Sequence, residues 1–173
     1  NFAVIVNDAG STVEGTNGNG ITFLNSNLVV NGGVVSGTLN GIQGGTHNTL
    51  TNLLGGVIVG ASNGYLGGSH QRVVNFGAIT GALDGVNVGG TSVVINAGRI
   101  VGTGADNDGV EVGSGSTVVN SGFIGANGPG SAFGIWGFGS SITVSNTGSI
   151  VGRGGIALDA LNSVIVNDGH VFG

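Results

Sequence analysis

Short runs of alternating apolar and polar residues recur along the whole chain at nearly regular intervals. The clearest copy, residues 94–102 (VINAGRIVG), has the form aliphatic-x-Asn-x-Gly-x-Ile-x-Gly. Close or looser copies follow one another, and their shared Asn residues are Asn7, Asn31, Asn52, Asn75, Asn96, Asn120, Asn146 and Asn167. Successive copies are therefore 21 to 26 residues apart. A period in this range is typical of solenoids, propellers and other repeat arrays.

A second, shorter motif lies between the copies and marks another extended segment. It is a Gly followed by an aliphatic residue or Tyr, as in Gly20-Ile21, Gly41-Ile42, Gly64-Tyr65, Gly85-Val86, Gly109-Val110, Gly134-Ile135 and Gly155-Ile156. The distance from this Gly to the next shared Asn is nearly constant, which implies a fixed path. Length variation collects before the motif, above all in residues 101–108 and 125–133, and such insertions often project from the binding side of a solenoid.

Each repeat thus contains three short extended segments rich in Val, Ile and Thr, separated by Gly, Asn, Ser and Asp. No stretch shows the apolar periodicity of a helix. We therefore predict an all-β fold, a parallel β-helix (β-solenoid) with three short strands per coil and about eight coils of 21–26 residues. Residues 1–173 are expected to form a single solenoid domain, as a fragment or mature piece of a longer chain.

Two positions are aliphatic in every copy, which predicts columns of like side chains inside the tube. They are the residue two before the Asn, such as Val94, and the residue at the Ile position, such as Ile100. Neighbouring coils would lie about 4.8 Å apart, where stiff β-branched side chains stack well. The Gly two residues after the Ile, such as Gly60, is expected at a corner where a positive φ or a lack of room excludes side chains.

The recurring Asn predicts a structural ladder in which each side-chain amide donates to one neighbouring coil and accepts from the other. Asn also tolerates the left-handed backbone conformation of a turn, which would help to bend one sheet into the next. The predicted ladder residues are Asn31, Asn52, Asn75, Asn96, Asn120, Asn146 and Asn167, with Asn7 in the looser first copy.

Composition narrows the classes of function. Gly makes up 40 of 173 residues but Pro occurs once, so the chain is not collagen-like. Only 6% of residues are charged, and the net charge is -5 with Arg as the sole cationic type. Without a basic stripe, nucleic-acid binding is not expected. The absence of Cys excludes disulfides and thiolate chemistry, and without a long apolar run we expect no membrane insertion of this segment.

The repeat, with its Asn-x-Gly-x-Ile-x-Gly core and its Gly-aliphatic pair in coils of 21–26 residues, resembles those of bacterial autotransporter passenger domains and related haemagglutinin-type adhesins. The resemblance covers residues 5–173 and involves scaffold positions, so it transfers no catalytic residue. It implies a right-handed, three-sided β-helix, export to the cell surface, and a role in adhesion or aggregation.

Acidic residues offer two candidate chemistries. Asp84 and Asp108 precede the Gly of the second motif in consecutive copies, where earlier copies have Asn. On adjacent coils their carboxylates would lie about 5 Å apart, near the separation in retaining glycosidases, but Asp can also simply replace Asn in a turn ladder. Asp106, Asp108 and Glu111 are a weak Ca²⁺ candidate, because their oxygens suit the ion while their spacing matches no known calcium loop.

Aromatic residues supply the candidate binding surface. Trp136 and Phe138, with Phe133 nearby, flank the insertion at residues 125–133 and could stack on a sugar or contact a partner protein. The alternative is that these rings cover the sheet or fill the tube. The three His residues, His47, His70 and His170, share no evident column and are expected on the surface.

We therefore expect an extracellular or bacterial cell-surface protein that is structural or adhesive and is not an enzyme. It would mediate adhesion, aggregation or self-assembly into fibres, with other copies of itself or a host protein or glycan as partner. No cofactor is expected. The alternatives are a carbohydrate-binding module, for which the Trp136 region is the discriminating feature, and a polysaccharide-degrading β-helix enzyme, which would need a cleft with grouped carboxylates.

Overall fold

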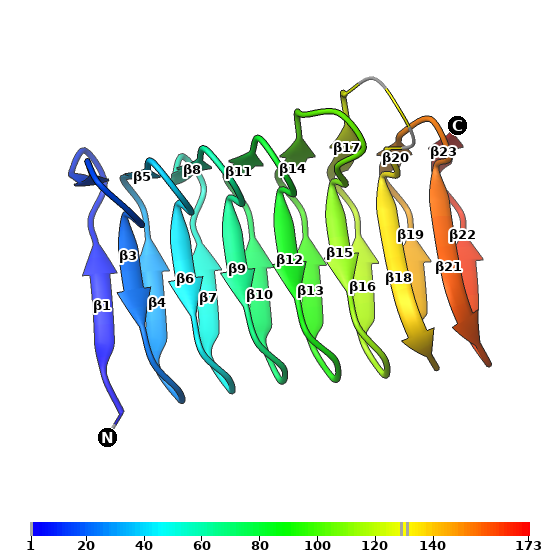
Figure 1. Cartoon of the computed structure of the whole chain (residues 1–173), viewed down its shortest axis with the longest axis horizontal. Coiled ribbons are helices and arrows are strands. Elements are labelled where there is room, and N and C mark those ends of the chain that lie inside the picture. The colour runs from blue at the N-terminus through cyan, green and yellow to red at the C-terminus, as the bar shows by residue number, and fades with distance from the viewer. Residues whose placement is uncertain (1, 129, 131) are drawn as a thin grey trace.

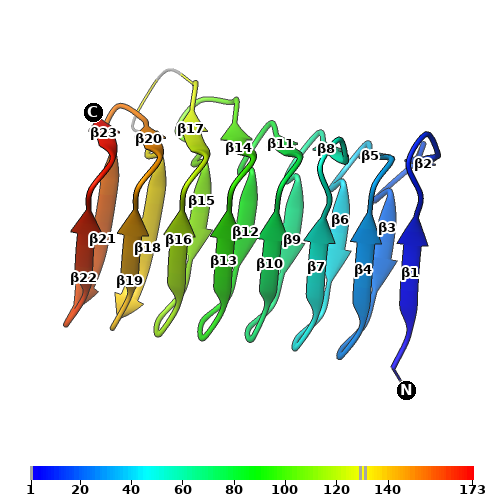
Figure 2. The same ribbon diagram turned by 180° about the vertical axis from the view of Figure 1, so that it is seen from behind.

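The chain forms a β-solenoid of about eight coils, each contributing one short strand to each of three parallel sheets. The computed structural model describes residues 2–128, 130 and 132–173. Successive coils lie side by side along one axis, and the N- and C-termini lie at opposite ends of it (Figures 1 and 2). This confirms the predicted all-β solenoid with three strands per coil. The described residues contain no helix, and therefore none that could span a membrane.

The three sheets contain every third strand in chain order. Sheet A consists of β1 (Val4–Asn7), β4 (Leu28–Asn31), β7 (Thr49–Asn52), β10 (Arg72–Asn75), β13 (Val93–Asn96), β16 (Thr117–Asn120), β19 (Thr143–Asn146) and β22 (Val164–Asn167). Sheet B consists of β2 (Thr12–Gly15), β5 (Val34–Gly37), β8 (Val57–Gly60), β11 (Ala78–Gly81), β14 (Arg99–Gly102), β17 (Phe123–Ala126), β20 (Ser149–Val151) and β23 (His170–Phe172). Sheet C consists of β3 (Ile21–Phe23), β6 (Ile42–Gly44), β9 (Tyr65–Gly67), β12 (Val86–Val88), β15 (Val110–Val112), β18 (Ile135–Ser140) and β21 (Ile156–Leu161).

The core is built from aliphatic columns that run along the axis. Register is kept from coil to coil, so that Val73 pairs with Val94 in sheet A and Ile79 with Ile100 in sheet B. In the inner coils these side chains are fully buried. Because side chains alternate between the two faces of a strand, the same register places a second set of columns on the outside of each sheet.

The Asn residues form the ladder that the sequence predicts. The Nδ2 of each donates to the Oδ1 of the Asn one coil further on, through seven hydrogen bonds of 2.7 to 2.8 Å from Asn7 to Asn167. The six Asn residues from Asn31 to Asn146 are at most 1% exposed. A buried amide satisfied on both sides stabilises the corner between sheets A and B.

Part of the backbone prediction was wrong. None of the ladder Asn residues has a positive φ, so the role that recurs from coil to coil is hydrogen bonding and not a left-handed turn. The left-handed position lies five residues earlier, in the turn from sheet C to sheet A, and its non-Gly members are Ser26, His47, His70, Thr91, Ser141 and Asn162. The corner at Gly60 excludes side chains through lack of room, because an added Cβ would collide with the carbonyl oxygen of Asn63.

The same left-handed turn corrects the expectation for two His residues. His47 and His70 do share a column, and their rings stack in parallel with centroids 4.3 Å apart. His170 lies elsewhere, on the outer end of sheet B, where its ring stacks on Phe172 at 5.8 Å.

The turn from sheet C to sheet A carries a second polar ladder that the sequence did not reveal. A side-chain oxygen of one coil accepts the backbone N–H of the preceding coil, as Asn48 Oδ1 does from Asn27 at 2.8 Å and Ser92 Oγ from Gln71 at 3.0 Å. The residue type changes along this column, so no single repeated letter marks it. Asn48 Nδ2 is buried without a hydrogen-bond partner.

Candidate functional site

The strongest candidate site lies on the outer face of sheet C, where three polar or aromatic side chains stand on consecutive strands. Asn87 of β12 pairs with Glu111 of β15, and Glu111 pairs with Trp136 of β18. Their neighbours along each strand, such as Val110 and Val112, are buried in the core. The alternation of a strand therefore turns Asn87, Glu111 and Trp136 outward as one row.

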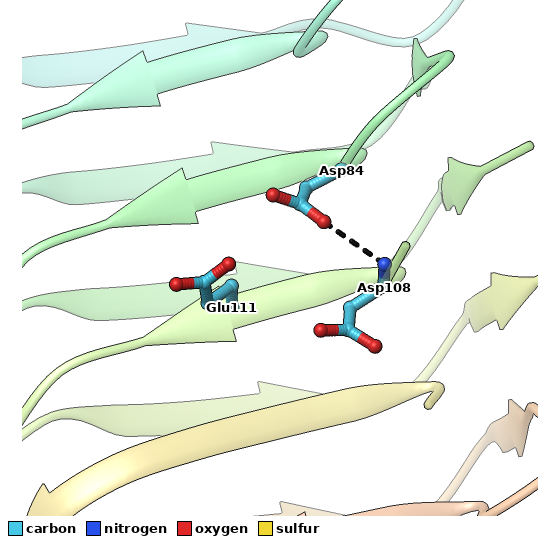
Figure 3. A group of neighbouring side chains, drawn as sticks. All are labelled: Asp84, Asp108 and Glu111. Carbon is cyan, nitrogen blue, oxygen red and sulfur yellow. Dashed lines mark hydrogen bonds between the residues drawn. The ribbon is translucent and has the colours of Figure 1, made fainter. Parts of the chain in front are cut away.

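Two further carboxylates stand beside this row, at the corner between sheets B and C. Asp84 Oδ1 accepts the backbone N–H of Asp108 at 2.9 Å (Figure 3). Asp108 Oδ1 in turn accepts the backbone N–H of Phe133 at 2.8 Å. In earlier coils Asn40 Oδ1 accepts from the N–H of Asn63 in the same way. Asp84 and Asp108 thus continue a corner ladder begun by Asn, and both are buried.

The register brings three carboxyl groups together. One oxygen each of Asp84, Asp108 and Glu111 lies within 4.8 Å of the others, with Glu111 facing the two Asp residues (Figure 3). Asn87 Nδ2 donates to Asp84 Oδ2 and to Glu111 Oε2, each at 2.9 Å. The acidic cluster is therefore cross-linked by an amide group as well as held by the backbone.

Burial and the charge of neighbouring carboxylates raise the pKa values of Glu111 and Asp108. Burial raises the pKa of Glu111 to about 7, and the charge of Asp84 and a hydrogen bond to it act in the same direction. Burial also raises the pKa of Asp108 to about 6, although the N–H of Phe133 partly opposes this by stabilising the carboxylate. Near neutral pH Glu111 is therefore partly protonated.

A pocket of about 430 Å³ opens next to the cluster, lined by Asp106, Asp108, Phe133 and Trp136. Phe133 and Trp136 are half-buried. The longest connections between sheets B and C, which follow β14 and β17, supply Asp106 and Phe133. The insertions that the sequence singled out thus border a concave site, although Pro129 and Ser131 lie outside the described residues.

The candidate residues predicted from sequence are only partly gathered here. Asp108 and Glu111 lie in the acidic cluster, but Asp84 of the preceding coil completes it in place of Asp106, which instead lines the pocket. Phe138 does not line the pocket; it is 40% exposed, and its ring centroid lies 6.0 Å from that of Trp136. Asn87 was not predicted from the sequence. It directly follows Val86 of the Gly-aliphatic motif, just as Glu111 follows Val110 in the next copy, and this shared position could have indicated that the two side chains are neighbours.

A second surface of interest is the outer face of sheet A. Sixteen side chains point outward from its eight strands: ten are Val, Leu or Ile, five are Thr or Ser, and the remaining one is Arg72. The face carries no other charge. Unlike the outer face of sheet C, it carries no cluster of three titratable groups among the described residues.

Comparison of the chain with protein-family models, with curated proteins and with solved structures found no match in any of the three. The two surfaces just described, the acidic-aromatic pocket on sheet C and the apolar face of sheet A, are therefore the features from which a function can be proposed.

Proposed function

We propose that this chain is a structural and adhesive β-solenoid of the extracellular space or the bacterial cell surface. It acts as a stiff rod that associates through its sheet faces. The observation that carries the proposal is the outer face of sheet A, which is mostly apolar and almost free of charge over eight strands. The resemblance of the repeats to autotransporter passengers and haemagglutinin-type adhesins supports the location.

The dimensions of this face indicate how such association would work. Seven coil steps of about 4.8 Å and four-residue strands of about 13 Å give a face of roughly 450 Å². A stable dimer buries about 800 Å² on each partner, so one pair of faces would bind weakly. We therefore expect association to emerge where many copies are displayed together, as they would be on a cell surface, since avidity multiplies weak contacts.

The test is the clumping of microspheres coated with the chain, measured by light scattering. Val119 lies on the outer face of sheet A and is 39% exposed, whereas Val59 lies on the outer face of sheet B and is 40% exposed. Val119→Lys places a charge on the proposed contact, and Val59→Lys is its matched control. We expect wild-type and Val59→Lys spheres to clump and Val119→Lys spheres to stay dispersed.

Two results would contradict the proposal. Wild-type spheres that stay dispersed at every coating density would remove the adhesive role. Equal clumping of the two Lys variants would show that contact does not depend on sheet A. Circular dichroism of each variant verifies that the solenoid is intact, so that loss of clumping is not loss of fold.

A further inference from the structure

We propose that the pocket lined by Asp106, Asp108, Phe133 and Trp136 binds a neutral saccharide unit. This goes beyond the structural role above and concerns a different sheet, so either proposal can fail without the other. The volume of about 430 Å³ lies in the lower part of the range of roughly 300–1,000 Å³ typical of small-molecule pockets.

The pocket is lined by both aromatic and acidic side chains. Trp136 stands in register beside Glu111 on sheet C, and Phe133 follows the corner ladder directly after Asp108 in the neighbouring coil. Such a pocket offers a ring surface to an apolar face and carboxylate oxygens to a polar edge. A pyranose presents both, because its C–H groups cluster on one face while its hydroxyl groups project around the rim.

Asp108 presents a hydrogen-bond acceptor to the pocket. Asp108 is 4% exposed, and its Oδ1 is occupied by the backbone N–H of Phe133. Its other carboxylate oxygen takes part in no hydrogen bond among the described residues, so it is free to accept one from a ligand in the pocket. A sugar hydroxyl donates the hydrogen bond that this oxygen lacks.

The hydrogen-bond donors and charges around the pocket favour a neutral sugar over a metal ion as its ligand. Asn87 turns its NH₂ group toward Asp84 and Glu111 and donates a hydrogen bond to each, so these inner carboxyl groups already have a donor. A Ca²⁺ ion would need six to eight oxygen ligands and would meet the donor atoms of Asn87. The negative charge of Asp108 also disfavours acidic sugars, which leaves neutral ones.

The experiment uses the fluorescence of Trp136, which is the only Trp in the chain and lines the pocket. The probes are methyl β-glucoside, methyl β-galactoside, methyl α-mannoside and methyl N-acetylglucosaminide, with glucuronate and CaCl₂ for comparison. We expect a saturable change in emission with at least one neutral glycoside, and none with glucuronate or Ca²⁺.

Variants distinguish the pocket from the surrounding surface. Asp108→Asn keeps the ladder acceptor, as Asn63 and Asn40 do in the same column, but removes the carboxylate; we expect binding to weaken at least about tenfold. Phe138→Ala removes an exposed ring outside the pocket and should leave affinity within about twofold. Calorimetry replaces fluorescence for Trp136→Leu, which should also bind at least about tenfold more weakly.

The proposal is overturned if no neutral glycoside changes the emission, or if Asp108→Asn binds as tightly as the wild type. A saturable response to Ca²⁺ alone would also overturn it and assign the site to a cation. If Phe138→Ala lost as much affinity as Trp136→Leu, the sugar would bind on the outer surface and not in the pocket, which would contradict the proposal.

Discussion

Removing one rung from the middle of the Asn ladder should cost far more than removing one at its end. Asn96 is fully buried; its Oδ1 accepts from Asn75 at 2.8 Å, and its Nδ2 donates to Asn120 Oδ1 at 2.8 Å. Asn96→Ala deletes both bonds, and with them the longer donations of Nδ2 to the carbonyl oxygens of Gly98 at 3.3 Å and Phe123 at 3.0 Å. Asn75 Nδ2 keeps the carbonyl oxygens of Gly77 and Arg99 as acceptors, but Asn120 Oδ1 is left buried without its ladder donor.

The size of the effect follows from these partners. Each lost hydrogen bond costs about 1 kcal/mol, and an orphaned buried acceptor costs a further 1–3 kcal/mol or so. Counting the two longer bonds together as one, we therefore expect Asn96→Ala to lower the free energy of unfolding by about 4–6 kcal/mol. Asn167 is exposed and accepts only from Asn146, which retains two backbone acceptors, so Asn167→Ala should cost less than about 1.5 kcal/mol.

The assay is equilibrium unfolding in urea, followed by far-ultraviolet circular dichroism and by the emission of Trp136. Both probes are needed because a solenoid can unfold in segments, and a single free energy is defined only where the two transitions coincide. If Asn96→Ala destabilises no more than Asn167→Ala, the ladder does not stabilise the fold in the way reasoned here.

Three further predictions concern other positions, and each is measured by the same denaturation assay. Gly60→Ala should cost roughly 2–4 kcal/mol because its Cβ would collide with the backbone of Asn63, whereas Gly18→Ala, with open space around it, should change stability by less than about 1 kcal/mol. Burial raises the pKa of Glu111 from 4.5 to about 7, so the folded state holds its proton more tightly than the unfolded state between these values. The stability of the wild type relative to Glu111→Gln should therefore fall by on the order of 1–2 kcal/mol from pH 5 to pH 8, allowing for partial exposure; a rise would contradict this sign. Asn48→Ser keeps the acceptor of the second polar ladder and removes a buried amide nitrogen that has no partner, so it should be neutral within about 1 kcal/mol, and a loss as large as that of Asn96→Ala would refute this.

The architecture could be predicted from the sequence alone because the same residue positions pair with one another in every coil. A column that must pack or hydrogen-bond against copies of itself tolerates few residue types, and this is why Val94 and Asn96 have counterparts of the same kind in every coil. The corner ladder was also foreseeable, since Asp84 and Asp108 stand where Asn stands in earlier coils.

Contacts that depend on geometry between different columns could not be predicted in this way. The stacking of His47 on His70 needs the left-handed turn that both occupy, and the turn has no fixed residue type. The cluster of Asp84 with Glu111 joins a corner position to a strand position in the next coil. Whether these two side chains meet depends on the angle between the corner and the strands of sheet C. Local spacing favoured Asp106 instead, but Asp106 lines the pocket and is not part of the carboxylate cluster.

The Asn ladder also gives the rod a direction. Every side-chain amide in it points the same way, so the dipoles add along the axis, with a carbonyl oxygen at the Asn7 end and an NH₂ group at the Asn167 end. A coil stacked on either end continues the ladder only in the same orientation, since the reverse orientation would set acceptor against acceptor or donor against donor. If copies were to stack on these ends, they would all have to point in the same direction along the axis.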